Sequence, residues 1–92
     1  MKKVVSIILL NYNNTKYTID CIKSLLNQTY SEFEVIIVDN GSDYRYYKKL
    51  VNDLEDFNER LDIKVLRAPY NLYFAGGNNK GIKNAKGIFY VC

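Results

Sequence analysis

The chain has 92 residues, 48% of them hydrophobic and 25% charged, which fits one small globular domain and excludes a disordered tail. It contains no histidine, which excludes histidine-based catalysis and most zinc sites, and its two cysteines are too few for a disulfide scaffold. The net charge is +3, and no stretch approaches the roughly 20 apolar residues of a membrane-spanning helix.

The first half of the chain predicts two strands and a helix between them. Val4–Leu10 is a continuous apolar run, typical of a strand that is buried on both faces. Apolar residues then recur at helical spacing after Asn14 or Thr15, either of which can cap a helix over about 15–28. Glu34–Asp39 predicts a second buried strand that ends in a carboxylate.

The second half continues the alternation. A turn at 41–43 leads into a helix over about 44–58, and Ile63–Arg67 predicts a short third strand. A helix over about 75–86 is weakened by its glycines, and Ile88–Cys92 predicts a fourth strand.

The order βαβαβαβ predicts an α/β fold of three layers (αβα). We expect one Rossmann-like domain over residues 1–92, with a parallel sheet of order 3-2-1-4 and right-handed crossovers. In such sheets ligands bind beyond the carboxyl ends of the strands, where the strand order reverses. Functional residues are therefore expected in the loops 11–14, 39–43 and 68–77.

Asp39 is the first candidate, because a carboxylate at a strand end can accept hydrogen bonds from a ribose or from a base N–H. It could equally cap the turn that follows at residues 40–42. The spacing leaves both interpretations open.

The first loop, 11–14, contains no glycine, which disfavours NAD or FAD because the pyrophosphate could not approach the backbone closely. A Walker A loop is absent as well. Tyr12 offers a flat face for a base, and Asn11 and Asn13 offer amide donors and acceptors. Alternatively, Tyr12 packs at the sheet edge and the asparagines make hydrogen bonds within the loop.

The segment 71–81 is the second unusual feature. Gly76 and Gly77 allow close approach to the backbone, and Asn78 and Asn79 could reach a diphosphate or a sugar. The alternative is a glycine-rich turn that binds nothing.

Residues 63–92 carry five basic side chains and no acidic one. Such a segment could favour an anionic partner such as a phosphorylated ligand, nucleic acid or a lipid surface. The spacing of three between Lys80, Lys83 and Lys86 favours the simpler interpretation, a solvated helix face.

Four stretches, Val5–Asn13, Cys21–Tyr30, Val35–Ser42 and Asn71–Gly81, occur in an order that resembles the N-terminal half of family 2 glycosyltransferases, which have the GT-A fold. Together they cover nearly the whole chain. The sequence of residues 74–79 is similar to that of a rhamnosyltransferase-like branch.

The resemblance implies that Asn11, Tyr12, Asn13, Asp39 and Asn78 bind a nucleotide sugar. Asp39 would then hydrogen-bond a uracil or thymine ring, against which Tyr12 and its loop would pack. Asn78 takes the place of an arginine that lies near the diphosphate in many relatives. Tyr73 stands where a glycine is common.

The resemblance further implies inverting transfer from a UDP- or dTDP-sugar to a saccharide, lipid or protein acceptor, as in cell-wall or polysaccharide biosynthesis. In the family an Asp-x-Asp motif soon follows a strand like Ile88–Cys92 and holds Mn²⁺ or Mg²⁺. This chain ends ahead of that motif. We therefore expect a nucleotide-sugar-binding portion with no catalytic residue, no metal ligand and no activity of its own.

A non-catalytic nucleotide-binding module is the alternative function. A response-regulator-like domain would need acidic residues at the end of the first strand, where Asn11 stands. We expect no nucleic-acid partner and a cytoplasmic or membrane-peripheral location. The short apolar edge strand 88–92 also predicts a homodimer through that edge.

Overall fold

The structure, a computed structural model, describes residues 5–27, 32–85 and 88–91. Strands and helices alternate along the chain as predicted: β1 (Val5–Asn11), α1 (Thr15–Leu25), β2 (Phe33–Asn40), α2 (Tyr44–Leu54), β3 (Asp62–Ala68), α3 (Tyr73–Lys83) and β4 (Ile88–Val91). The bounds of α2 and α3 differ most from expectation. The second helix ends at Leu54 and not near 58, and the third covers 73–83 in place of 75–86.

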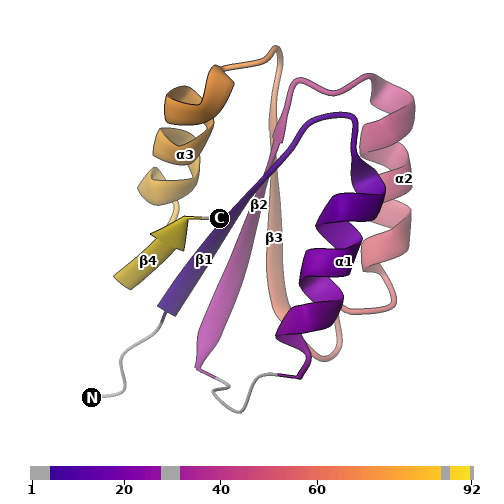
Figure 1. Cartoon of the computed structure of the whole chain (residues 1–92), viewed down its shortest axis with the longest axis vertical. Coiled ribbons are helices and arrows are strands. Elements are labelled where there is room, and N and C mark those ends of the chain that lie inside the picture. Colours follow the sequence, from indigo (N-terminus) through magenta and orange to yellow (C-terminus); the bar gives the residue numbers. More distant parts are fainter. Residues whose placement is uncertain (1–4, 28–31, 86–87, 92) are drawn as a thin grey trace.

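The four strands form one parallel sheet in the order β3-β2-β1-β4, which confirms the predicted order (Figure 1). The register aligns the carboxyl ends of three strands: Asn11 of β1 lies opposite Asp39 of β2, and Asp39 lies opposite Arg67 of β3. A row of three polar side chains therefore crosses the sheet where its apolar part ends.

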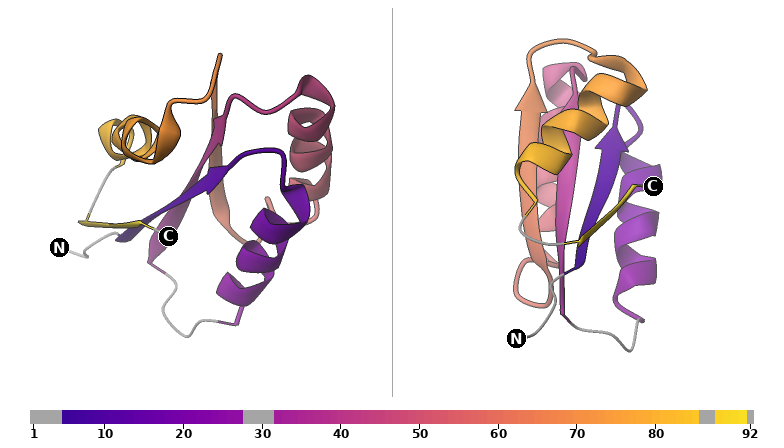
Figure 2. Two further views of the ribbon diagram at one scale, coloured as in Figure 1. Left: turned by 45° about the horizontal axis from the view of Figure 1, so that its top comes forward. Right: turned by 90° about the vertical axis from the view of Figure 1, so that its left-hand side faces the viewer.

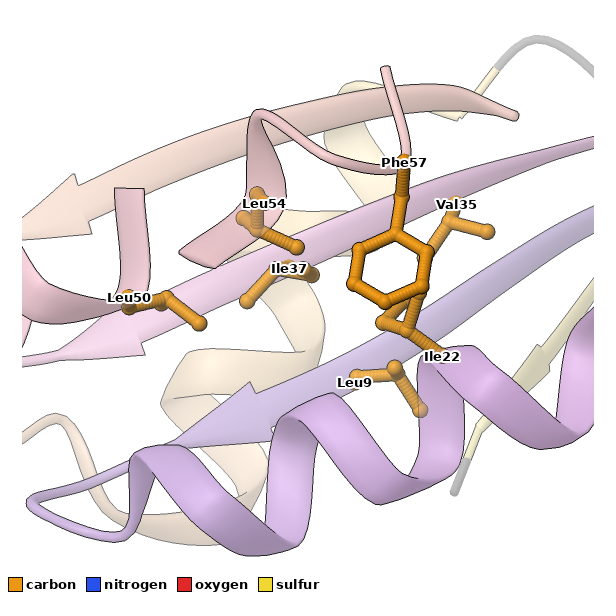
Figure 3. Close-up of a cluster of buried hydrophobic side chains, with 7 residues drawn as sticks. All are labelled: Leu9, Ile22, Val35, Ile37, Leu50, Leu54 and Phe57. Carbon is orange, nitrogen blue, oxygen red and sulfur yellow. The ribbon is translucent and has the colours of Figure 1, made fainter. Parts of the chain in front are cut away.

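Helices cover both faces of this sheet, α1 and α2 on one side and α3 on the other (Figure 2). Successive side chains of a strand point to opposite faces, so the apolar runs of β1 and β2 supply both cores. The larger core lies under α1 and α2 (Figure 3) and comprises Leu9, Ile22, Val35, Ile37, Leu50, Leu54 and Phe57. The smaller one faces α3 and comprises Ile8, Ile36 and Val38.

The glycines of α3 explain why a segment of low helix propensity is helical. An added Cβ at Gly81 would lie 2.6 Å from Ile8 Cγ2, and one at Gly77 would lie 2.9 Å from Leu10 Cδ2. Any side chain there would push the helix off the sheet. Close packing against the sheet therefore outweighs the propensity cost of about 1 kcal/mol per glycine.

The basic residues of α3 fit the simpler of the two interpretations as far as they are described. Lys83 is exposed and Lys80 partly buried, and both lie in the last turn, where cations interact favourably with the helix dipole. Lys86 lies outside the described residues.

The carboxyl-terminal strand pairs with β1 at the edge of the sheet. The side chains of 88–92 lie outside what the structure describes, so the homodimer through this edge stays a prediction. Among the described helices, none combines the length and hydropathy required to cross a bilayer.

Candidate functional site

The polar row at the carboxyl edge is a connected hydrogen-bond network. The Asp39 side chain is completely buried, and both of its oxygens have partners. Oδ1 accepts a hydrogen bond from Asn11 Nδ2 at 3.0 Å, and Oδ2 pairs with Arg67 Nη1 at 2.5 Å. A carboxylate without solvent needs such partners, since an unpaired buried charge costs several kcal/mol. Asp39 therefore makes cross-strand contacts, and it makes no turn-capping hydrogen bond that the structure records.

Arg67 is a site residue that the sequence analysis did not single out. Its Nη2 donates to the Ser42 carbonyl at 3.1 Å, and its guanidinium lies 4.6 Å from the centre of the Tyr47 ring and 5.9 Å from that of Tyr44. The side chain is 31% exposed, in contrast to the buried carboxylate. The Arg67 guanidinium is thus held by Asp39 and the Ser42 carbonyl while part of the side chain remains accessible to solvent. An arginine that ends a strand next to a strand ending in aspartate was the available signal.

The asparagines of the first loop organise the edge. Asn11 also accepts a hydrogen bond from Thr18 of α1. Asn13, at φ +56°, donates its N–H to Ser42 Oγ at 2.8 Å and accepts from the Asp43 N–H at 3.0 Å. These contacts match the alternative in which the asparagines make hydrogen bonds within loops. Contact of either residue with a ligand stays a prediction.

Exposed aromatic rings surround this network. Tyr12 is 51% exposed, and Tyr44 and Tyr70 are more open still. Tyr12 therefore does not pack beneath the sheet edge, which leaves its face available to a flat ligand. Of these rings, that of Tyr44 lies 5.9 Å from the Arg67 guanidinium.

The α3 side of the same edge is built around Asn40. Its Oδ1 accepts from the Leu72 N–H at 2.9 Å, and its Nδ2 donates to the Tyr73 carbonyl at 3.0 Å. An added Cβ at Gly77 would lie 2.9 Å from that Nδ2, so a glycine is needed here to leave space for the Asn40 side chain and its two hydrogen bonds. The space at Gly77 is thus filled by protein atoms, which corrects the expectation that this glycine admits a ligand to the backbone.

Asn78 lies on the buried face of α3 and is only 6% exposed. Within the described part of the chain, its Oδ1 has no hydrogen-bond partner. Strand alternation places the Asp39 side chain on the α1/α2 face of the sheet, opposite to α3. The structure therefore brings Asn11, Asn13 and Asp39 together and sets Asn78 apart from them.

The described residues offer no ready set of metal ligands. Residues 5–27, 32–85 and 88–91 contain no group of three or more acidic, cysteine or histidine side chains that could hold an ion. The expectation of Mn²⁺ or Mg²⁺ in a longer protein concerns residues that follow this stretch.

Comparison with known proteins identifies relatives along nearly the whole chain. Residues 6–92 match the model of the family described as glycosyl transferase family 2. An uncharacterized glycosyltransferase of Haemophilus influenzae is 33% identical over 90 residues, which cover 96% of this chain and 26% of the relative.

Solved structures of glycosyltransferases are also similar to this chain. S. aureus TarS (residues 1–349), solved in complex with UDP-GlcNAc, is 31% identical with a TM-score of 0.75, covering 99% of this chain and 26% of TarS. The mannosyltransferase PcManGT of Pyrobaculum calidifontis, solved with GDP-Man and Mn²⁺, has a TM-score of 0.82 at 19% identity, covering 95% of this chain and 26% of its own, and shows likeness of fold. This chain spans about a quarter of the length of these proteins. The match over residues 6–92 shows that the chain belongs to glycosyl transferase family 2.

Proposed function

We propose that this chain binds the nucleotide of a UDP- or dTDP-sugar at the carboxyl edge of β1, β2 and β3. The observation that carries the proposal is the hydrogen-bonded row Asn11–Asp39–Arg67, in which the partly exposed Arg67 covers a buried carboxylate, with the exposed ring of Tyr12 in the loop that follows β1. Pyrimidine bases present alternating donors and acceptors on one edge and flat faces above and below. The polar row and the tyrosine complement these two features.

The network assigns different roles to its members. Asp39 is buried and accepts from two donors, so a base can reach its carboxylate only if the Arg67 side chain moves away from one oxygen. Arg67 is partly exposed, and its guanidinium carries five N–H groups, more than its two recorded hydrogen bonds use. Arg67 therefore makes the first contact with a base carbonyl, and Asp39 holds it in place and accepts a base N–H after a small shift. Tyr12 stacks on the base.

The uridine or thymidine preference rests on the family and on TarS, which was solved with UDP and with UDP-GlcNAc. We include in the proposal that the chain belongs to the rhamnosyltransferase-like branch of the family, because of the sequence of residues 74–79. Asn78 belongs to the diphosphate end of the site in this assignment, and its unpaired Oδ1 leaves it able to accept a hydrogen bond. Titration with dTDP-rhamnose beside UDP-GlcNAc distinguishes the two donors.

The protein that carries this domain transfers the sugar with inversion to a saccharide, lipid or protein acceptor. One similar protein is named poly-beta-1,6-N-acetyl-D-glucosamine synthase, from Staphylococcus epidermidis, at 30% identity over 88 residues. This supports a role in polysaccharide synthesis. The domain contributes donor recognition to that reaction.

The test is a calorimetric titration of the chain with UDP and dTDP, using ADP as the mismatched base. Asp39→Ala should weaken UDP binding about three- to tenfold, because it removes a direct hydrogen bond and the group that positions Arg67. Asp39→Asn keeps the shape of the side chain and checks the result if the alanine variant is poorly folded. Asp43→Ala removes a 70% exposed carboxylate from the same edge and should leave affinity unchanged. UDP binding that is equal in the wild type and both Asp39 variants would refute the site.

A further inference from the structure

Tyr73 adopts a conformation that tyrosine disfavours. Its φ of +60° lies in the left-handed region, where a Cβ crowds the following carbonyl. Bulky residues are genuine outliers there, whereas glycine adopts it freely. The position opens α3, so a glycine would form the same turn without strain.

Packing does not compensate for this strain. The Tyr73 side chain is 78% exposed, and Phe74 beside it is 67% exposed. The hydrogen bonds that fix the residue come from its backbone: its N–H donates to Asn71 Oδ1 at 2.7 Å, and its carbonyl accepts from Asn40 Nδ2 at 3.0 Å. Any residue could make these contacts. The ring therefore adds nothing evident to the stability of the fold.

The hydrogen bond from Asn40 attaches the backbone of Tyr73 to the strand end that carries the proposed nucleotide site. Asn40 directly follows Asp39 in β2 and points to the α3 face, so Tyr73 is attached to the neighbour of the site's central carboxylate. The turn at Gly41 reinforces this, since a Cβ added there would overlap the backbone of Tyr70 and Asn71. The position of Tyr73 is thus fixed relative to the site by two independent contacts between loops.

We infer that Tyr73 is a specificity-determining residue whose ring stacks on the face of a pyranose. The inference rests on the proposed function, which places the base on the α1/α2 side of the sheet. What extends beyond the base toward α3 is the diphosphate and its sugar. A pyranose offers an apolar C–H face and a hydroxylated edge, to which an aromatic ring with a phenolic hydroxyl is suited. Strain at an exposed aromatic residue is then retained for binding.

Two sources can supply the pyranose: the sugar of the donor and a saccharide acceptor. The chain is titrated with UDP, with UDP-GlcNAc and with tri-N-acetylchitotriose, and binding is followed by NMR. Tyr73→Gly should weaken binding of UDP-GlcNAc about three- to tenfold and leave UDP unchanged if the donor's sugar is bound. Loss confined to the trisaccharide assigns the ring to the acceptor.

Stability provides a second, independent readout. Tyr73→Gly relieves the backbone strain, so the midpoint of thermal unfolding should rise by about 2–5 °C while binding weakens. Tyr73→Phe keeps the ring and should retain most of the affinity. Tyr17→Ala removes a tyrosine of α1 that is 65% exposed and should leave the affinity for all three ligands unchanged.

The outcomes separate this inference from the proposed function. A wild-type chain that does not bind UDP contradicts the proposed nucleotide site, and Tyr73 is then judged on the sugar ligands alone. Equal weakening of UDP and UDP-GlcNAc by Tyr73→Gly would assign the ring to the base and overturn the sugar assignment. Unchanged binding of UDP-GlcNAc and of the trisaccharide would overturn it as well.

Discussion

The two faces of the sheet meet at one carboxyl edge but are built in different ways. On the α1/α2 face, Asn11, Asp39 and Arg67 form a network in which both oxygens of the buried carboxylate have partners. On the α3 face, Asn40 clamps the loop that precedes the helix, and the residues beyond it are strained or lack partners: Tyr73 at φ +60° and Asn78 with an unpaired Oδ1 among the described residues.

This difference suggests different proposed roles for the two faces. In the proposed function, the connected network on the α1/α2 side positions Arg67 and Asp39 for a base, so little reorganisation is needed on binding. On the α3 side, the strain at Tyr73 and the unpaired Asn78 Oδ1 have no compensation among the described residues, which is why we propose that both contact a ligand. The larger core lies beneath the first side and the smaller core beneath the second. Stability is thus distributed unequally over the two faces.

The sharpest test of the unequal cores is a pair of substitutions at adjacent residues of β2. Ile37→Ala should cost about 3–5 kcal/mol, because its cavity opens among six other buried side chains beneath two helices. Ile36→Ala, beneath α3 alone, should cost about 2–3 kcal/mol, since its half-buried neighbours can relax into the space. Urea unfolding of the two variants measures the difference. Equal losses would contradict the unequal division of stability.

The turn that joins the two faces should be nearly as sensitive. Gly41 has φ +81°, and an added Cβ would lie 2.7 Å from Tyr70 Cα and closer still to the next backbone atoms. Gly41→Ala should therefore cost about 3 kcal/mol, from left-handed strain together with a backbone overlap that no rotamer can relieve.

Gly76→Ala is the matched control for that turn. Its Cβ would lie 2.8 Å from a single atom, Leu72 Cβ, so the residue before α3 must shift slightly, and the gain in helix propensity of about 1 kcal/mol offsets part of that cost. We expect a smaller drop in thermal midpoint than for Gly41→Ala, whose Cβ overlaps three backbone atoms at a positive φ. A Gly41→Ala variant as stable as this control would show that the loops of the two faces are not locked together.

The smallest effect tests the network itself. Arg67→Ala leaves the buried Asp39 without its cation and should cost about 2 kcal/mol, less than a fully buried pair because Arg67 is 31% exposed. Arg45→Ala removes an arginine that is 77% exposed and 3.9 Å from Asp43, and should change stability by less than about 0.5 kcal/mol. Chemical denaturation compares the two, and losses of equal size would contradict the coupling of Asp39 to Arg67.

Local patterns in the sequence were enough for the elements and their order. Continuous apolar runs indicate strands buried on both faces, and the alternation with amphipathic segments requires parallel strands and crossovers. Asp39, Tyr12 and the first loop were located at the carboxyl edge of the sheet by the same reasoning, and their contact with a ligand stays a prediction. Asn14 was one of two candidate helix caps, with Thr15, and the structure selects Asn14, whose side chain accepts from the Tyr17 N–H.

The partners of those residues were decided by the tertiary structure. Asp39 lies 28 residues from both Asn11 and Arg67, and only the register of the sheet aligns the three. The glycines of α3 illustrate the same limit, because a low-propensity segment becomes helical only when a sheet presents Ile8 and Leu10 for close contact. Sequence determines local propensity and hydrophobic period. Which side chains share a buried charge, and which backbone is strained, depends on contacts between segments that are distant in sequence.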